Sequence, residues 1–299
     1  MTTLADPIQT GTTPSPPPRR SHRRRSFGYP RKGSVWSYGA LLAVVAGSVF
    51  PLYWSVVVSS QTSDAVTKVP PALVPGGHLF DNIARVFDTT DFGRALVNSF
   101  IVSGSITVSV VFFSTLAGFA FAKLRFRGRK ALLVVAIATS MVPHQLGIIP
   151  LYILMADLGW TGRLTAVIVP GLVTAFGVFF MTQYLGRAVP DELLEAGRVD
   201  GSSTFGLYWH IVLPAARPAA AVLGLFTFMQ AWNDFFWPLV VLQNNATVQV
   251  ALSALASGYT TDYTLTLTGT LLATLPILVV FMLLGRHLVD GIMQGAVKG

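Results

Sequence analysis

Long apolar runs separated by shorter polar segments dominate this chain. A helix needs about 20 mostly apolar residues to cross a bilayer. Six stretches meet this requirement, and each contains glycine, proline or small polar residues, as is typical of helices that pack against other helices. The predicted spans are 36–58, 96–121, 131–155, 164–185, 218–241 and 268–287. The pattern therefore predicts an all-α membrane protein with six transmembrane helices.

Residues 1–34 differ from the rest of the chain. They are rich in Thr, Pro, Ser and Arg and contain too few apolar residues to form a core. Such a composition is typical of disorder. We therefore expect a disordered basic tail over 1–34 and one membrane domain over 35–299.

Basic residues are concentrated in alternate polar segments. Seventeen lie in the tail, in 122–130, in 186–217 and near the C-terminus; the other four of the 21 Lys and Arg residues are Lys68, Arg85, Arg94 and Arg163. Cytoplasmic loops of membrane proteins carry an excess of Lys and Arg. The bias therefore predicts that both termini and the two loops 122–130 and 186–217 face the cytoplasm.

The overall composition excludes several classes of function. The chain is 52% hydrophobic and 11% charged, has a mean hydropathy of +0.60 and contains no cysteine. Its five histidines are scattered, so we expect no metal site. The net charge of +8 follows the membrane topology, so no nucleic-acid partner is expected. A Gly-x-x-x-x-Gly-Lys-Ser/Thr loop does not occur in the sequence, so the chain is not itself a P-loop ATPase.

The polar loop 187–216 carries signals for a short helix followed by a turn. Pro190 suits the first turn of a helix, where its missing N–H has no partner to lose. The acids Asp191, Glu192 and Glu195 then lie near the positive N-terminal end. Gly201 can adopt a positive φ and end this helix.

A second short helix is expected after Gly201. Ser202 or Ser203 can cap it, and apolar residues recur at helical spacing between 205 and 212. Pro214 is expected to end it before the next span. Two short helices around a glycine turn form a rigid element that can bind a groove on a soluble partner.

The residues of this loop follow a known spacing. The sequence reads Glu195-Ala196-Gly197, three residues, Gly201, nine residues, Ile211, one residue, and Leu213-Pro214. It resembles the cytoplasmic-loop signature of bacterial ABC importer permeases, with Gly197 where Ala is commoner. The resemblance implies a type I ABC importer permease fold in which this loop couples the spans to a separate ATPase. The implied ATPase-coupling residues are Glu195, Ala196, Gly197, Gly201, Ile211, Leu213 and Pro214.

Further segments resemble the carbohydrate branch of these permeases, in particular the smaller six-span permease of maltose-type systems. They are Phe228–Pro238, Met141–Pro143 with Ile149–Tyr152, Asn98-Ser99, and the C-terminal glycines. The resemblance implies a non-enzymatic subunit of the bacterial cytoplasmic membrane that imports a carbohydrate. Its implied partners are a second permease, two copies of an ATPase that carries the ATP and Mg, and an extracytoplasmic solute-binding protein.

Polar residues inside the fifth span remain open to two interpretations. An acid within a span is costly and often functional, so Trp232, Asn233 and Asp234 are candidates for the substrate path. Alternatively, Asp234 caps an interrupted helix, as Asn233 and Pro238 indicate. His144 is interpreted as a packing residue rather than a proton relay.

Other functions stay open at this point. An ABC permease for a non-sugar solute would share the same mechanism. An ATP-independent secondary transporter usually needs more intramembrane charge than Asp234. A membrane enzyme would need clustered catalytic groups, which the spans lack. The sequence does not identify the sugar or say whether this subunit contacts it.

Overall fold

The structure is a computed structural model, and all regular secondary structure in its described residues is helical. It confirms the prediction of an all-α protein. The described residues are 35–66, 69–257 and 262–296, with side chains except at 144 and 286–296. The predicted tail 1–34 lies outside them, so its disorder stays a prediction.

The chain divides into two units, residues 1–49 and 50–299, and the second contains the helices discussed below. Helix α1 (Val35–Ser59) begins in the first unit and ends in the second. Its 25 residues are long and apolar enough to cross a membrane, as the first predicted span required.

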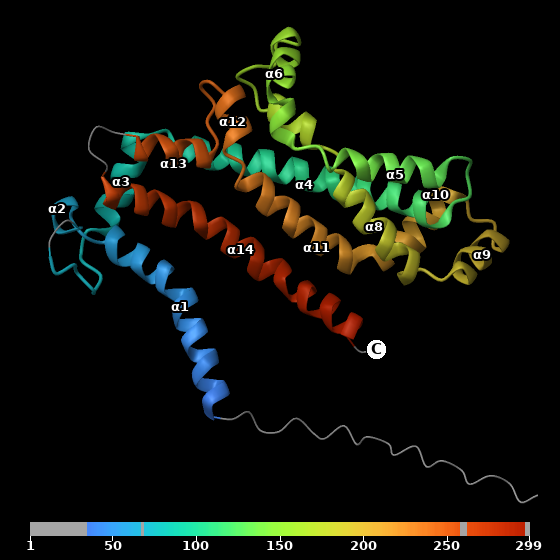
Figure 1. Cartoon of the computed structure of the whole chain (residues 1–299), viewed down its shortest axis with the longest axis horizontal. Helices are drawn as coiled ribbons and strands as arrows, with labels where there is room; N and C mark the ends of the chain where they lie inside the picture. Colours follow the sequence, from blue (N-terminus) through green and yellow to red (C-terminus); the bar gives the residue numbers. More distant parts are fainter. Residues whose placement is uncertain (1–34, 67–68, 258–261, 297–299) are drawn as a thin grey trace, which may run out of the picture. The chain divides into compact units, whose positions relative to one another are not determined.

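Long helices lie lengthwise beside one another in the second unit (Figure 1). The most extensive helix–helix contact is between α4 (Phe92–Lys123) and α8 (Ala175–Ala188). Helix α11 (Leu213–Trp232) lies against both. Helix α14 (Tyr263–Ala296) packs on α11. The described residues contain five helical stretches that are long and apolar enough to span a membrane: Val35–Ser59, Phe92–Lys123, Thr165–Ala188, Thr204–Trp232 and Tyr263–Gly285.

The third predicted span, 131–155, is not one continuous helix. Helix α5 (Arg129–Thr139) ends before Pro143, and a 3₁₀ turn (His144–Gly147) leads into α6 (Ile148–Asp157). Proline lacks the N–H that an α-helix needs and disfavours helical backbone in the residue before it. The structure therefore does not confirm 131–155 as one transmembrane helix.

The fifth predicted span is interrupted, as the sequence indicated. Helix α11 ends at Trp232, and α12 (Phe236–Val241) begins after a short break. The fourth span is likewise built from α7 (Thr165–Ile168), a 3₁₀ turn at Pro170 and α8. Irregular backbone at such depth is tolerated where protein surrounds it.

Close helix contacts form the core of the bundle. Buried side chains of α4, α8 and α11 make one apolar cluster, which includes Val110, Met181 and Leu223. At Gly118 of α4, an added Cβ would lie 2.7 Å from the Cβ of Met181 and 2.9 Å from its carbonyl carbon. Only glycine therefore permits this approach of α4 to α8. A second cluster lies where α11 and α14 meet α13 (Val248–Ala256).

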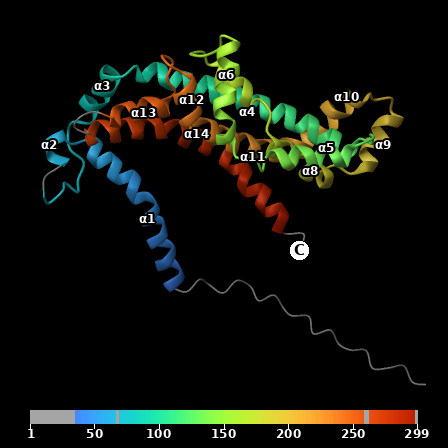
Figure 2. The same ribbon diagram turned by 45° about the horizontal axis from the view of Figure 1, so that its top comes forward.

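Short helices occupy the two ends of the bundle, as the turned view also shows (Figure 2). At one end lie α2 (Ser63–Val66), α3 (Leu79–Thr89) and α13. At the opposite end lie α9 (Asp191–Val199) and α10 (Thr204–Leu207), which belong to the loop 187–216.

Candidate coupling site

The first helix of the loop is α9, which begins directly after Pro190. Asp191 and Glu192 lie in its first turn, and Arg198 lies in its last turn. This order of charges complements the helix dipole at both ends. The prediction of a short helix here is confirmed, and Glu195 and Ala196 are exposed on it.

Gly201 ends α9 in a turn that needs a positive φ. Its φ is 82°, and its N–H donates to the carbonyl of Arg198 at 3.0 Å. The N–H of Ser202 donates to the carbonyl of Gly197 at 2.9 Å, which completes a Schellman motif. No atom lies within 4 Å of a Cβ added at Gly201, so the backbone conformation rather than space favours glycine.

Ser203 begins the second helix of the loop. Its Oγ accepts a hydrogen bond from the N–H of Gly206 at 3.1 Å. Of the two candidate serines, Ser203 is therefore the cap of α10, and its hydroxyl satisfies one of the free N–H groups at the helix start.

Pro214 does not end this second helix, contrary to the sequence-based prediction. The chain continues from α10 through a π turn (Tyr208–Val212) into α11, and the N–H of Leu213 donates to the carbonyl of Tyr208, five residues back. Pro214 stands in the first turn of α11. The wide π turn repositions the preceding carbonyls, so the proline ring is accommodated without breaking the helix. The second helix of the loop is therefore the start of a span.

Helix α9 packs tightly on this continuous helix. Leu194 is buried in the same cluster as Leu207 and Val212. A Cβ added at Gly197 would lie 2.5 Å from Cδ2 of Leu207 and 3.2 Å from Cδ1 of Ile211. The structure thus brings together the signature residues Gly197 and Ile211, which are far apart in the loop, and it seats α9 against the base of a span.

Lys123 joins α9 to two further spans. Its ammonium group lies 2.8 Å from Oδ1 of Asp191 and 3.3 Å from the carbonyl oxygen of Gly186 in α8. The hydrogen bond and the charge of Lys123 hold the pKa of the exposed Asp191 carboxyl below its usual value. This contact was not predicted from the sequence. A signal for the position of Lys123 was available, since it is the basic residue that ends a long apolar run.

The π turn is tied to α4 by a buried hydrogen bond. The hydroxyl of Tyr208 lies 2.9 Å from Oγ1 of Thr115. The single hydroxyl proton of Thr115 is directed to the carbonyls of Val111 and Phe112, so Tyr208 is the donor. The loop is thus bonded directly to α4.

The outer surface of the loop remains apolar in places. Leu193 and Val199 of α9 are 52% and 87% exposed, and Phe205 and Trp209 are also exposed. We call these four residues the loop face; Leu193 and Val199 stand three positions before and after the small residue Ala196 on α9. Exposed apolar residues beside small ones are typical of a protein-docking surface.

The candidate substrate-path residue Trp232 is buried. It is 1% exposed, its Nε1 donates to the carbonyl of Ala273 at 3.2 Å, and its ring stacks on Phe228 with centroids 5.5 Å apart. Phe100 covers it edge-on with centroids 4.9 Å apart. In this conformation the Trp232 ring offers no free face to a sugar.

Asn233 and Asp234 lie in the break between α11 and α12. The side chain of Asn233 donates to the carbonyl of Met229 at 2.8 Å and accepts from Gln249 at 3.3 Å. The Asp234 carboxylate accepts hydrogen bonds from backbone N–H groups of α12. This supports the helix-capping interpretation, and a role for the pair in the substrate path stays a prediction.

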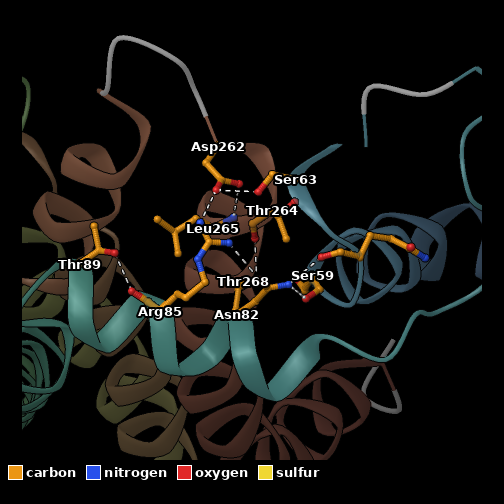
Figure 3. Close-up of polar contacts among 10 residues, drawn as sticks. Ser59, Ser63, Asn82, Arg85, Thr89, Asp262, Thr264, Leu265 and Thr268 are labelled. Carbon is orange, nitrogen blue, oxygen red and sulfur yellow. Dashed lines mark hydrogen bonds and ion pairs between the residues drawn. The ribbon is translucent and has the colours of Figure 1, made fainter. Parts of the chain in front are cut away.

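A polar cluster at the other end of the bundle was not predicted from the sequence. Arg85 of α3 donates to Oδ2 of Asp262 at 2.8 Å and to Asn82 at 3.2 Å, and Ser63 donates to the same Asp262 oxygen at 2.9 Å (Figure 3). Asp262 also accepts from the N–H of Leu265 at 3.1 Å and thereby caps α14. We call these residues the Arg85 clasp. No local sequence signal links Arg85 with Asp262, because 177 positions separate them.

The pKa of Asp262 reflects opposing effects. Partial burial alone would raise it, but the hydrogen bonds from Arg85, Leu265 and Ser63 and the positive charge of Arg85 outweigh that effect, so the pKa is lowered. The described residues contain no group of three or more His, Asp or Glu that could hold a metal ion. The hydrogen bonds of the clasp join α2 and α3 to the start of α14.

Comparisons with known proteins match this arrangement. Residues 111–294 match the family described as "Binding-protein-dependent transport system inner membrane component". The lactose transport system permease protein of Rhizobium radiobacter is 34% identical over 270 residues, covering 90% of this chain and 97% of that protein. The arabinooligosaccharides transport system permease protein of Halalkalibacterium halodurans is 32% identical, with coverage of 87% and 94%.

A third relative and a solved structure agree with these matches. The sn-glycerol-3-phosphate transport system permease protein of Yersinia pestis is 31% identical, with coverage of 88% and 98%. A chain in the crystal structure of a bacterial ABC transporter involved in alginate import has a TM-score of 0.72 at 22% identity, covering 84% of this chain and 96% of that chain. The three relatives are transport permeases rather than enzymes. The chain belongs to the family of binding-protein-dependent transport system inner membrane components, and is a multi-pass protein of the bacterial inner membrane.

Proposed function

We propose that this chain is a permease subunit of an ATP-driven, binding-protein-dependent importer of a carbohydrate. The observation that carries the proposal is the seating of α9. Leu194, Gly197 and Lys123 fix it to the ends of three spans, while the loop face stays exposed. A partner bound to the loop face would therefore move the spans themselves.

The coupling mechanism follows from these contacts. ATP and Mg bind to the ATPase partner, whose closure pulls on α9 through the loop face. Because α10 is continuous with α11, and Tyr208 is bonded to Thr115 of α4, the displacement reaches both helices without an intervening flexible linker. The coupling residues remain Glu195, Ala196, Gly197, Gly201, Ile211, Leu213 and Pro214.

The proposed assembly contains a second, related permease, two copies of the ATPase and an extracytoplasmic solute-binding protein. The family description names binding-protein dependence. A second alginate transporter structure, with a TM-score of 0.58 at 15% identity, is described in complex with an alginate-bound periplasmic protein. Both observations support a binding-protein partner for this chain.

The proposed topology has six passes with both termini in the cytoplasm. The half-length helices α5 and α6 would together form the third pass, so that α9 lies inside and the Arg85 clasp outside. The distribution of Lys and Arg supports this orientation. Since the chain has no cysteine, single cysteines at Arg127 and Leu73 would report the two sides directly through labelling of intact cells.

The first experiment is affinity purification of the tagged chain in mild detergent with mass spectrometry of the proteins that accompany it. Recovery of a P-loop ATPase and a second permease is expected. Val199→Glu should abolish ATPase recovery, because it charges the loop face, whereas Val74→Glu at another highly exposed position, in the segment before α3, should not. Recovery of the chain alone, with solute uptake into vesicles without ATP, would favour a secondary transporter.

The cargo is proposed from the relatives, two of which are named for sugars or oligosaccharides. The glycerol-phosphate relative supports a second candidate, a phosphorylated polyol. Binding of candidate sugars and of glycerol phosphate to the co-purified binding protein, followed by ATP-dependent uptake, distinguishes the two. Uptake of amino acids or peptides alone would contradict both.

A further inference from the structure

A basic hollow lies between the end of α4 and the start of α5. It has a volume of about 600 Å³, opens to the surface, and is lined by Arg125, Phe126, Gly128, Arg129, Lys130 and Ala131. Three of its six lining residues carry a positive charge, and none carries a negative charge. It lies at the same end of the bundle as α9 (Figures 1 and 2).

No described carboxylate forms an ion pair with the cations of this hollow, although the charge of Arg125 acts on the Asp191 carboxyl from a longer distance. Arg129 donates to the carbonyl of Leu124 at 3.1 Å, which fixes its position without neutralising it. The nearby carboxylate of Asp191 is bound by Lys123. Neither Arg125 nor Lys130 forms an ion pair with any described residue, so the hollow is suited to an anion from outside the chain.

The surface beside the hollow is apolar. Phe126 is exposed at its edge, and Leu132 and Val135, one turn apart on α5, are more than half exposed. Val134, which lies between them in the sequence, is also exposed and apolar. Inorganic phosphate would contact the cations but not these apolar residues. A phospholipid would contact the cations through its headgroup and the apolar residues through an acyl chain.

We propose that this hollow binds the headgroup of an anionic phospholipid of the inner leaflet, with an acyl chain lying along α5. Basic pockets between membrane helices on the cytoplasmic side are suited to anionic headgroups. The placement in the inner leaflet rests on the proposed topology. The lipid would lie on the segment 125–131, which directly follows the end of α4 and Lys123, and so support the position of α9.

The test uses the full-length chain purified in detergent. Native mass spectrometry and melting temperature would be followed during titration with phosphatidylglycerol, with phosphatidylcholine and inorganic phosphate as separate arms. Arg125→Gln with Lys130→Gln removes two cations and leaves the structural Arg129 in place. Arg187→Gln with Arg217→Gln removes two exposed cations elsewhere in the chain, and Arg125→Lys with Lys130→Arg keeps the charge.

We expect the wild type, the Arg187/Arg217 variant and the charge-conserving variant to retain phosphatidylglycerol. Apparent affinity should fall roughly 10- to 30-fold in the Arg125/Lys130 variant, the loss expected for two cations close to an anionic surface. Equal retention by all variants would overturn the proposal. Competition by inorganic phosphate would also overturn it, because it would show a free-anion site instead. These readouts do not depend on transport, so they are separate from the test of the proposed function.

Discussion

Lys123 illustrates how much a single residue can contribute at the coupling site. Its side chain is 7% exposed, yet its ammonium group contacts α8 and the first turn of α9. Lys123→Gln removes the charge that holds Asp191, so α9 should exchange its amide hydrogens faster and ATP-driven uptake should fall. Arg187→Gln, at an exposed site one residue from Gly186, should change neither quantity.

The pH dependence of this contact has a defined sign. Because the folded-state pKa of Asp191 is lowered, the contact is fully present above the usual carboxyl pKa and is lost only as the pH falls through the lowered value. Hydrogen exchange of 191–199 should therefore be insensitive to pH near neutrality, after correction for intrinsic rates. A change of protection between about pH 6 and about pH 8, far above the usual range of a carboxyl, would contradict the assignment.

A substitution at Gly201 tests the backbone conformation of the loop rather than its side-chain packing. An added Cβ has open space both at Gly201 and at Gly186 of α8, but only Gly201 has a positive φ. Gly201→Ala should destabilise the chain by about 1 kcal/mol, the cost of left-handed backbone. Gly186→Ala should be neutral or stabilise by about 0.5 kcal/mol, since alanine favours helix. Melting temperatures of the two purified variants, at equal expression, measure the difference.

At the scale of helices, the length and hydropathy of the apolar runs were enough to predict the five long apolar helices. The polar loop was also predictable, because Pro190, Gly201 and Ser203 each have a local role that depends on few neighbours. Whether Pro143 and Pro214 would break their helices was harder to predict. The first breaks a helix and the second does not, because the π turn before Pro214 changes the geometry that a proline meets. No local residue pattern specifies that turn.

The link between the π turn and α4 can be measured by a double-mutant cycle. Tyr208→Phe removes the donor and Thr115→Val removes the acceptor of the buried hydrogen bond. Each single variant should lose about 1 kcal/mol of stability, with a coupling energy of the same order between them. Additive losses would show that the two groups do not interact in the membrane.

At the scale of the whole molecule, the contacts between distant segments could not be predicted from the sequence. Asp191 and Lys123 are 68 positions apart, and Asp262 and Arg85 are 177 positions apart. Their charges were visible in the sequence, but pairing them requires the packing of α3 on α14 and of α9 on α4. The fold of the loop was thus predictable, whereas the contacts that join it to the bundle needed the structure. Its role in coupling stays a proposal.

The Arg85 clasp should stabilise the end of the bundle opposite to α9. Asp262→Asn removes the charge bound by Arg85 and Ser63, so the melting temperature at neutral pH should fall. Because the pKa of Asp262 is lowered in the folded state, its contribution is present above the usual carboxyl pKa and is lost as the pH falls through the lowered value. The difference between wild type and Asp262→Asn should therefore narrow at strongly acidic pH.

The π turn also sets the angular relation between the loop and the bundle. Each residue of an α-helix turns the chain by about 100°. A π turn takes up one extra residue within a turn, so this rotation is not passed on from α11 to α10. If 208–212 kept all its residues but wound as ordinary α-helix, α10 would rotate about the axis of α11 by that angle, and Leu207 would face away from Gly197. The π turn therefore defines the rotational setting at which Leu207 meets Gly197.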